Sequence, residues 1–138
     1  MPRRDIIHNA VRNALVKDGW IITADPYRIA YGEEDFYIDL AAQLPLAAER
    51  GGQKIAVEIK SFIGRSPVND LQEALGQYAL YLTLLEETEP ERKLYLALSK
   101  AVHDELAQMR AFGLILRRFG VALIIVQVQT EEIVQWIN

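Results

Sequence analysis

The sequence predicts a mixed α/β (α+β) fold in which one central sheet is covered by helices on both faces. Apolar residues make up 51% of the 138 residues, which is enough to build the core of one domain spanning residues 1–138. Segments with helical periodicity are interleaved with strand-like segments in the order α-β-β-β-α-β-α-β. Residues 121–129 begin with the continuous apolar run VALIIV, which is typical of a strand with both faces covered.

The first part of the chain predicts a helix and an edge segment. From Ile7 to Leu15 the apolar residues recur at the i, i+3, i+4 spacing, so residues 3–18 are expected to form a helix that stops at Gly19. Residues 20–32 are interrupted by a proline at position 26, which indicates a strand or an irregular edge.

The middle of the chain predicts an antiparallel strand pair, a long helix and a further strand. Residues 36–43 (FYIDLAAQ) and 54–62 (KIAVEIKSF) are strand-like, and residues 44–52 would connect them as a long turn. Residues 68–87 carry a helical apolar stripe, and residues 92–99 (RKLYLALS) predict a strand.

The last part of the chain predicts a helix and two strands. Residues 100–120 are expected to form one helix that ends at Gly120. Residues 121–129 follow as a strand, and residues 131–138 can pair back as a terminal strand.

Bulk properties exclude several classes of protein. The chain has no cysteine, so a disulfide scaffold or thiolate metal site is excluded and a reducing compartment is expected. Neither a signal peptide nor an apolar run of transmembrane length occurs, so we expect a cytoplasmic protein without a membrane partner. The net charge of −4 argues against non-specific coating of nucleic acid. An acidic net charge is still compatible with a small basic patch beside an acidic site.

Two strand-like runs carry charges where a buried strand should be apolar. Glu58 and Lys60 point to the same face because side chains alternate along a strand. If the two runs pair, Asp39 can lie opposite Glu58, and two like charges in that position are destabilising. A cation such as Mg²⁺ or Mn²⁺ would remove the repulsion, and Lys60 could orient a water molecule. The alternative is a solvated strand face without a function.

Asp39, the segment VEIK at 57–60, and a helix that carries Gln77 and Tyr81 together resemble the PD-(D/E)xK nuclease superfamily. The resemblance implies a restriction-endonuclease-like core, α-β-β-β-α-β, and a metal-dependent endodeoxyribonuclease activity. It implies catalytic roles for Asp39, Glu58, Lys60 and Gln77, with Mg²⁺ or Mn²⁺ held by Asp39, Glu58 and the Ile59 carbonyl. The proline that the superfamily places before the first aspartate is replaced by Ile38. Gln77 can also be read as an ordinary polar position on an amphipathic helix.

Several separate stretches resemble the XisH family, including KDGWIITADPY, PLAAERGGQKIAVEIKSF, DLQEALGQY and EEIVQWIN. The family is named for controlling excision of the fdxN DNA element in cyanobacteria. The resemblance implies a DNA-element excision controlling factor with a companion excision-controlling protein as a partner. DNA is a further expected partner, and a homo-oligomer is one of the expected states. Two functions stay open: a DNA endonuclease, or a non-catalytic accessory factor that binds DNA or a partner protein and directs a separate recombinase.

Residues near the expected site are candidates for contact with DNA. The candidates are Arg3, Arg4, His8, Arg12, Arg65 and Tyr81. A solvated helix position is the alternative for His8, and a core aromatic is the alternative for Tyr81. Lys54 is expected on the side of the site, and the acidic residues between Glu86 and Glu91 are expected away from it.

Overall fold

The computed structural model describes residues 3–44, 52–62, 64 and 66–138, with side chains from residue 6 onward. A six-stranded mixed sheet forms the centre, in the order β1-β4-β5-β6-β7-β8. Its strands are β1 (Ile21–Ala24), β4 (Leu40–Gln43), β5 (Lys54–Ile59), β6 (Arg92–Ser99), β7 (Leu123–Gln127) and β8 (Glu132–Ile137). The central strands β5, β6 and β7 are mutually parallel, and the other neighbours are antiparallel. The terminal strand predicted to pair back is therefore confirmed as β8.

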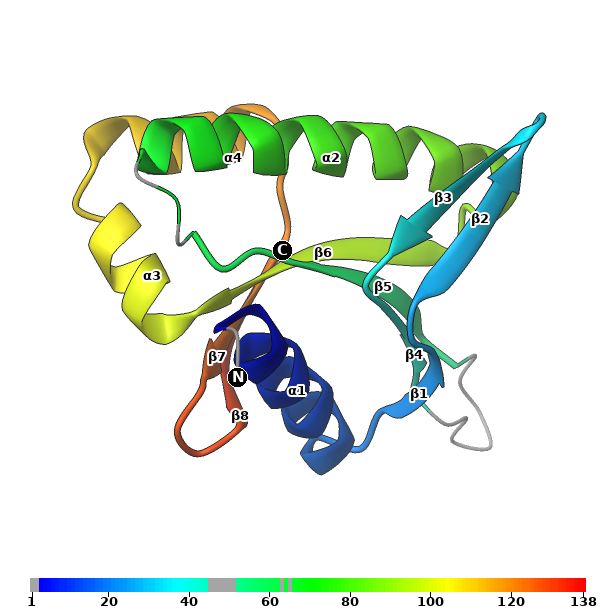
Figure 1. The fold of residues 1–138 in the computed structure, drawn as a ribbon, viewed down its shortest axis with the longest axis horizontal. Helices are drawn as coiled ribbons and strands as arrows, with labels where there is room; N and C mark the ends of the chain where they lie inside the picture. The colour runs from blue at the N-terminus through cyan, green and yellow to red at the C-terminus, as the bar shows by residue number, and fades with distance from the viewer. Residues whose placement is uncertain (1–2, 45–51, 63, 65) are drawn as a thin grey trace.

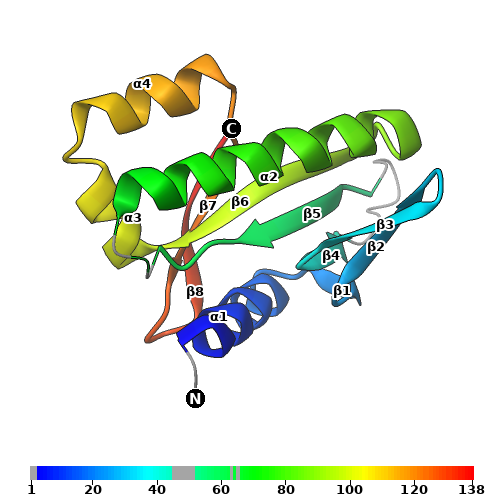
Figure 2. The ribbon, with the colours of Figure 1, turned by 45° about the horizontal axis from the view of Figure 1, so that its top comes forward.

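Helices cover both faces of this sheet, as predicted. Helix α1 (Arg3–Lys17) lies on one face, and α2 (Pro67–Thr88) with α4 (Arg110–Arg118) lies on the other (Figure 1). Figure 2 shows α2 running across the sheet, with α1 on the far side of it. The shorter helix α3 (Lys100–Leu106) follows β6 directly. None of the described helices has the length and apolar character needed to cross a membrane.

Strand alternation divides the core into two apolar layers. Leu94, Leu96 and Leu98 of β6 pack with α2, whereas Tyr95 and Ala97 pack with α1. The same alternation continues in β5 and β7, so these strands are apolar on both faces. Along β5 it places Ala56 on the α2 face, and Glu58 shares that face two residues later.

The run predicted as one strand over residues 36–43 is divided at Asp39. Its first half is β3 (Glu34–Ile38), which pairs with β2 (Tyr27–Tyr31) in a separate two-stranded sheet. Its second half is β4, which enters the main sheet between β1 and β5. The single-strand prediction was wrong because one run of β-type residues serves two sheets. The hairpin β2–β3 projects beside the end of α2 (Figure 1).

The single helix predicted over residues 100–120 was also wrong. The chain leaves helical geometry at Met109, which is extended with φ −83° and ψ 122°, and α3 and α4 lie on either side. A continuous helix that buries Leu106 would turn Arg110 and Gly113 toward the core. The break changes the phase, and Phe112 and Leu116 are buried instead.

Helix boundaries elsewhere follow their capping residues. Ser66 accepts the Asn69 backbone N–H at 3.2 Å, and Pro67 occupies the first helical position of α2. Helix α4 ends before Gly120, whose φ of 61° lies in the left-handed region that glycine adopts without strain. The predicted stop at Gly120 is confirmed, and the Ser66 cap fixes where α2 begins beside the end of β5.

Candidate functional site

The carboxylates of Asp39 and Glu58 meet where β4 and β5 separate. Leu40 pairs with Val57 in the antiparallel ladder, so the next position outward sets Asp39 opposite Glu58, as predicted. The Asp39 backbone N–H donates to Glu58 Oε1 at 3.3 Å, and the Ile59 backbone N–H donates to Asp39 Oδ2 at 2.8 Å. Both side chains therefore replace backbone partners at the end of the ladder, which fixes them beside each other.

Glu58 is a buried charged residue, with 7% of its surface exposed. Burial, followed by the neighbouring charge of Asp39, raises the pKa of Glu58 to about 8. Lys60 opposes the increase only weakly. Near neutral pH one proton is therefore retained at this pair, and a cation could replace it.

A pocket of about 360 Å³ opens over these residues. It is lined by the end of β5, by the start of α2 and by Ile7 and His8 of α1. The structure brings Asp39, Glu58, Ile59, Lys60 and Gln77 together in its wall. The structure therefore places these candidate site residues in one pocket, while their chemical roles stay predictions.

Lys60 is held by helix α2. Its Nζ donates to Glu73 Oε1 at 2.7 Å, with the lysine side chain 17% exposed. Asp70, one turn earlier on α2, accepts the Gly64 backbone N–H at 3.0 Å and ties the segment after β5 to the helix. The pocket wall thus contains four carboxylates and one ammonium among the described residues.

Gln77 contributes an oxygen atom with an unmet hydrogen bond. Its Oε1 is buried and has no partner within the described part of the chain. A buried acceptor of this kind is destabilising unless water, a ligand or a cation satisfies it. Tyr81, one turn further, is half-buried against the core, and burial raises its pKa, followed by the charges of Glu58 and Asp39. Tyr81 is therefore close enough to the two carboxylates to be affected by their charge, but it does not line the pocket.

His8 and Arg12 are joined by a residue that sequence reasoning missed. Asp25 Oδ1 lies 2.9 Å from His8 Nε2, and Asp25 Oδ2 lies 3.1 Å from Arg12 Nε. His8 therefore borders the pocket in a fixed orientation, while Arg12 is 45% exposed and already paired. The sequence around Asp25 gave no indication of this contact, because it depends on how the chain after β1 returns beside α1.

The other missed residues carried a visible signal. Asp70, Glu73 and Gln77 follow the i, i+3, i+7 spacing of one helix face, so the position of Gln77 also places the two acids. Among the expected DNA contacts, the side chains of Arg3, Arg4 and Arg65 lie outside the described residues.

Lys54 was predicted on the side of the site, and this was wrong. It is the first residue of β5, whereas Glu58 is the last but one, and the Lys54 Nζ lies 3.9 Å from Glu89 and 4.0 Å from Glu91. A strand rises about 3.3 Å per residue, so the two ends lie well apart. Of the acidic residues expected away from the site, Glu89 and Glu91 lie near Lys54 at this other end of β5, as predicted.

The oxygen atoms of the site fit a hard divalent cation. A residue in a strand directs its N–H and C=O to the same edge, so the Ile59 carbonyl faces the edge where its N–H meets Asp39. Two carboxylates, this carbonyl and the unpartnered Gln77 Oε1 are all oxygen donors, which Mg²⁺ and Mn²⁺ prefer. No group of three or more His, Cys, Asp or Glu side chains suited to a metal occurs in the described ranges. Water would therefore complete the coordination.

Comparison with known proteins gives one consistent result. The family model described as XisH protein matches residues 1–134. An XisH family protein from Nostoc punctiforme is 38% identical, with a TM-score of 0.86 over 97% of this chain and 100% of that chain. An fdxN element excision controlling factor protein from Anabaena variabilis is 40% identical, with a TM-score of 0.86 over 98% of this chain and 100% of that chain. No curated protein matches the chain significantly.

Proposed function

The chain belongs to the XisH family, and we propose that it is a DNA-element excision controlling factor that cleaves DNA with Mg²⁺ or Mn²⁺. One observation carries the cleavage proposal: hydrogen bonds from the Asp39 and Ile59 backbone N–H groups fix the carboxylates of buried Glu58 and Asp39 side by side, and the Glu58 pKa is raised to about 8. A structural role does not require two adjacent carboxylates, since like charges are destabilising at this spacing.

The residues of the site have distinct roles in this proposal. Asp39, Glu58 and the Ile59 carbonyl would hold the metal, which supplies charge neutralisation at the phosphate and a more acidic bound water. Lys60 would position the attacking water and face the charge that develops on the phosphate. Gln77 would orient a phosphate oxygen or a water through the amide whose oxygen is unpartnered.

The order of elements supports an assignment to the PD-(D/E)xK superfamily. Without the projecting hairpin β2–β3, the chain runs α1, β1, β4, β5, α2, β6, which is the α-β-β-β-α-β order of that superfamily. The acidic pair and the lysine lie at the end of β5, and the helix that follows brings Gln77 to them.

Cleavage of supercoiled plasmid DNA tests the proposal. We expect wild type to nick the plasmid with Mg²⁺ or Mn²⁺ and not with a chelator, and Lys60→Ala to lower the rate by about 100-fold. Lys100→Ala is the matched control, because Lys100 also pairs with a carboxylate, Asp104 at 2.6 Å, but lies outside the pocket. Equal nicking rates in the two variants would count against the site.

A second function, a non-catalytic accessory factor, is supported by the charge of the pocket. Lys60 is bound to Glu73, and four carboxylates in the wall oppose the approach of a phosphate. In this case the protein would bind DNA at another surface, or bind a partner protein, and direct a separate recombinase. Salt-sensitive DNA binding without nicking by any metal-loaded sample would favour this second function.

A further inference from the structure

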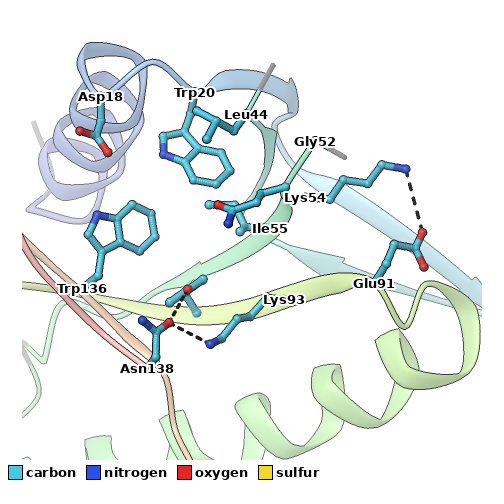
Figure 3. A pocket seen from close by; sticks show the side chains of 12 residues that line it. Asp18, Trp20, Leu44, Gly52, Lys54, Ile55, Glu91, Lys93, Trp136 and Asn138 are labelled. Carbon is cyan, nitrogen blue, oxygen red and sulfur yellow. Dashed lines mark hydrogen bonds and ion pairs between the residues drawn. The ribbon is translucent and has the colours of Figure 1, made fainter. Parts of the chain in front are cut away.

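A second pocket lies at the other end of the sheet, where β5 and β6 begin (Figure 3). Its volume is about 710 Å³, within the range of small-molecule sites. The turn after α1, the start of β5, the start of β6 and the end of β8 all contribute to its wall. It shares no lining residue with the pocket of Asp39 and Glu58 among the described residues.

One side of the second pocket is aromatic. The rings of Trp20 and Trp136 are 5.7 Å apart with an angle of 35° between their planes, and Tyr95 meets Trp136 edge-on at 5.1 Å. Figure 3 shows the two indoles side by side in the wall. Trp20 and Tyr95 are buried and Trp136 is half-buried, so the neighbours hold the Trp136 ring in place. A partly open and immobilised indole is a suitable surface for stacking a planar ring.

The other side of the pocket carries two lysines and an oriented amide. Lys93 Nζ and the Tyr95 hydroxyl both donate to Asn138 Oδ1, at 2.8 Å and 2.6 Å, which leaves the Asn138 amide nitrogen as a donor. Lys93 therefore has a neutral partner rather than a carboxylate in this contact. Lys54 meets its acidic partners only at 3.9 and 4.0 Å and is 37% exposed, so it can turn to an anion at little cost.

We propose that this pocket binds a nucleotide, with the base against Trp136 and the phosphate between Lys54 and Lys93. A purely apolar ligand would leave both ammonium groups without a new partner, and a small inorganic anion would not use the aromatic wall. A nucleoside phosphate satisfies both sides, and the Asn138 amide can donate to an oxygen of the base or the phosphate. The nucleotide can be free in solution or be an unpaired residue of a DNA strand.

Tryptophan fluorescence reports on this pocket alone, because Trp20 and Trp136 are the two tryptophans of the chain. The full-length protein is titrated with thymidine monophosphate and, separately, with a single-stranded thymidine oligonucleotide of about eight residues. We expect saturable quenching, and little response to thymidine or inorganic phosphate alone. Lys54→Ala and Lys93→Ala should each weaken binding by about tenfold. Lys100→Ala, whose lysine lines neither pocket, should leave it unchanged.

The outcomes separate the two sources of nucleotide. Quenching by the oligonucleotide alone assigns the pocket to a DNA strand, and quenching by the monophosphate alone assigns it to a free nucleotide. The absence of a saturable response to both at millimolar concentration overturns the proposal, as does a Lys54→Ala/Lys93→Ala variant that is folded by circular dichroism and binds as wild type. Since fluorescence detects binding without cleavage, a negative result here leaves the proposed nuclease site untouched.

Discussion

The two ends of strand β5 hold buried or half-buried carboxylates in opposite electrostatic states. Near its start, Glu89 accepts from Arg92 Nε at 2.8 Å and from Arg92 Nη2 at 3.0 Å, and it also accepts from the Tyr27 hydroxyl. The hydrogen bonds from Arg92 lower the pKa of Glu89. At the end of the strand, burial and then Asp39 raise the pKa of Glu58 to about 8.

The difference separates a structural cluster from a candidate functional one. Arg92 also donates to the Ile55 carbonyl at 2.9 Å and lies over the Tyr27 ring at 4.8 Å, so the Glu89 cluster ties β5, β6 and the hairpin together. Each charge there has its partner. Glu58 lies beside a second carboxylate, and no cationic side chain among the described residues is paired with it as Arg92 is with Glu89. Buried groups with strongly shifted pKa values are common at functional sites.

Removing Arg92 from the Glu89 cluster should have the largest effect on the stability of the fold. We expect Arg92→Ala to lower the free energy of unfolding by about 4 kcal/mol, because Glu89 and two backbone carbonyls lose their partner. Urea denaturation measures the change. The matched control is Arg28→Ala, which breaks an exposed pair with Asp35 and should lower stability far less. Similar losses in the two variants would mean that the Glu89 cluster is not structural.

Replacing Glu58 by a neutral residue should stabilise the protein at high pH. The folded-state pKa of Glu58 lies above its unfolded value of 4.5, so the stability it contributes is complete below pH 4.5 and is lost as pH rises to about 8. Glu58→Gln removes that loss, and we expect a gain of about 2 kcal/mol at pH 8.5 and almost none at pH 4.5. Denaturation curves at the two pH values measure it.

Glu89→Gln should change the pH dependence of stability in the opposite direction. The folded-state pKa of Glu89 is lowered, so its contribution is present above the unfolded value and is lost as pH falls through the folded value. This variant should be less stable than wild type at neutral pH, and the difference should shrink in acid. If the two variants respond to pH in the same direction, the contrast between the ends of β5 is mistaken.

The sequence predicted the site better than it predicted the path of the chain to it. Alternation along β5 placed Glu58 and Lys60 on one face, and pairing of the two runs placed Asp39 opposite Glu58. Both rules depend only on neighbours in a strand. The division of residues 36–43 between two sheets could not be predicted in this way, because it depends on which partner each half meets.

Other misses also depend on tertiary contacts. The break at Met109 allows Phe112 and Leu116 to reach the core, and the local pattern alone is compatible with one helix. Lys54 was placed by its closeness to Glu58 in the sequence, although a strand carries residues four apart to distant positions. The aromatic pocket was missed because Trp20 and Trp136 lie at opposite ends of the chain.

Addition of Mg²⁺ should change stability by less than Arg92→Ala or Glu58→Gln does, and it tests the pair of Asp39 and Glu58 most directly. A cation that binds the folded site stabilises it by mass action, so 10 mM Mg²⁺ with a dissociation constant on the order of 1 mM adds about 1.4 kcal/mol. The cation competes with the proton on Glu58, and the increase in melting temperature should therefore be larger at pH 8.5 than at pH 6.5. Asp39→Asn should remove the increase. Glu73→Gln should keep most of it, because Glu73 lines the same pocket outside the pair. If Mg²⁺ leaves the melting temperature unchanged at both pH values, or raises it equally in Asp39→Asn, the two carboxylates are not a metal site.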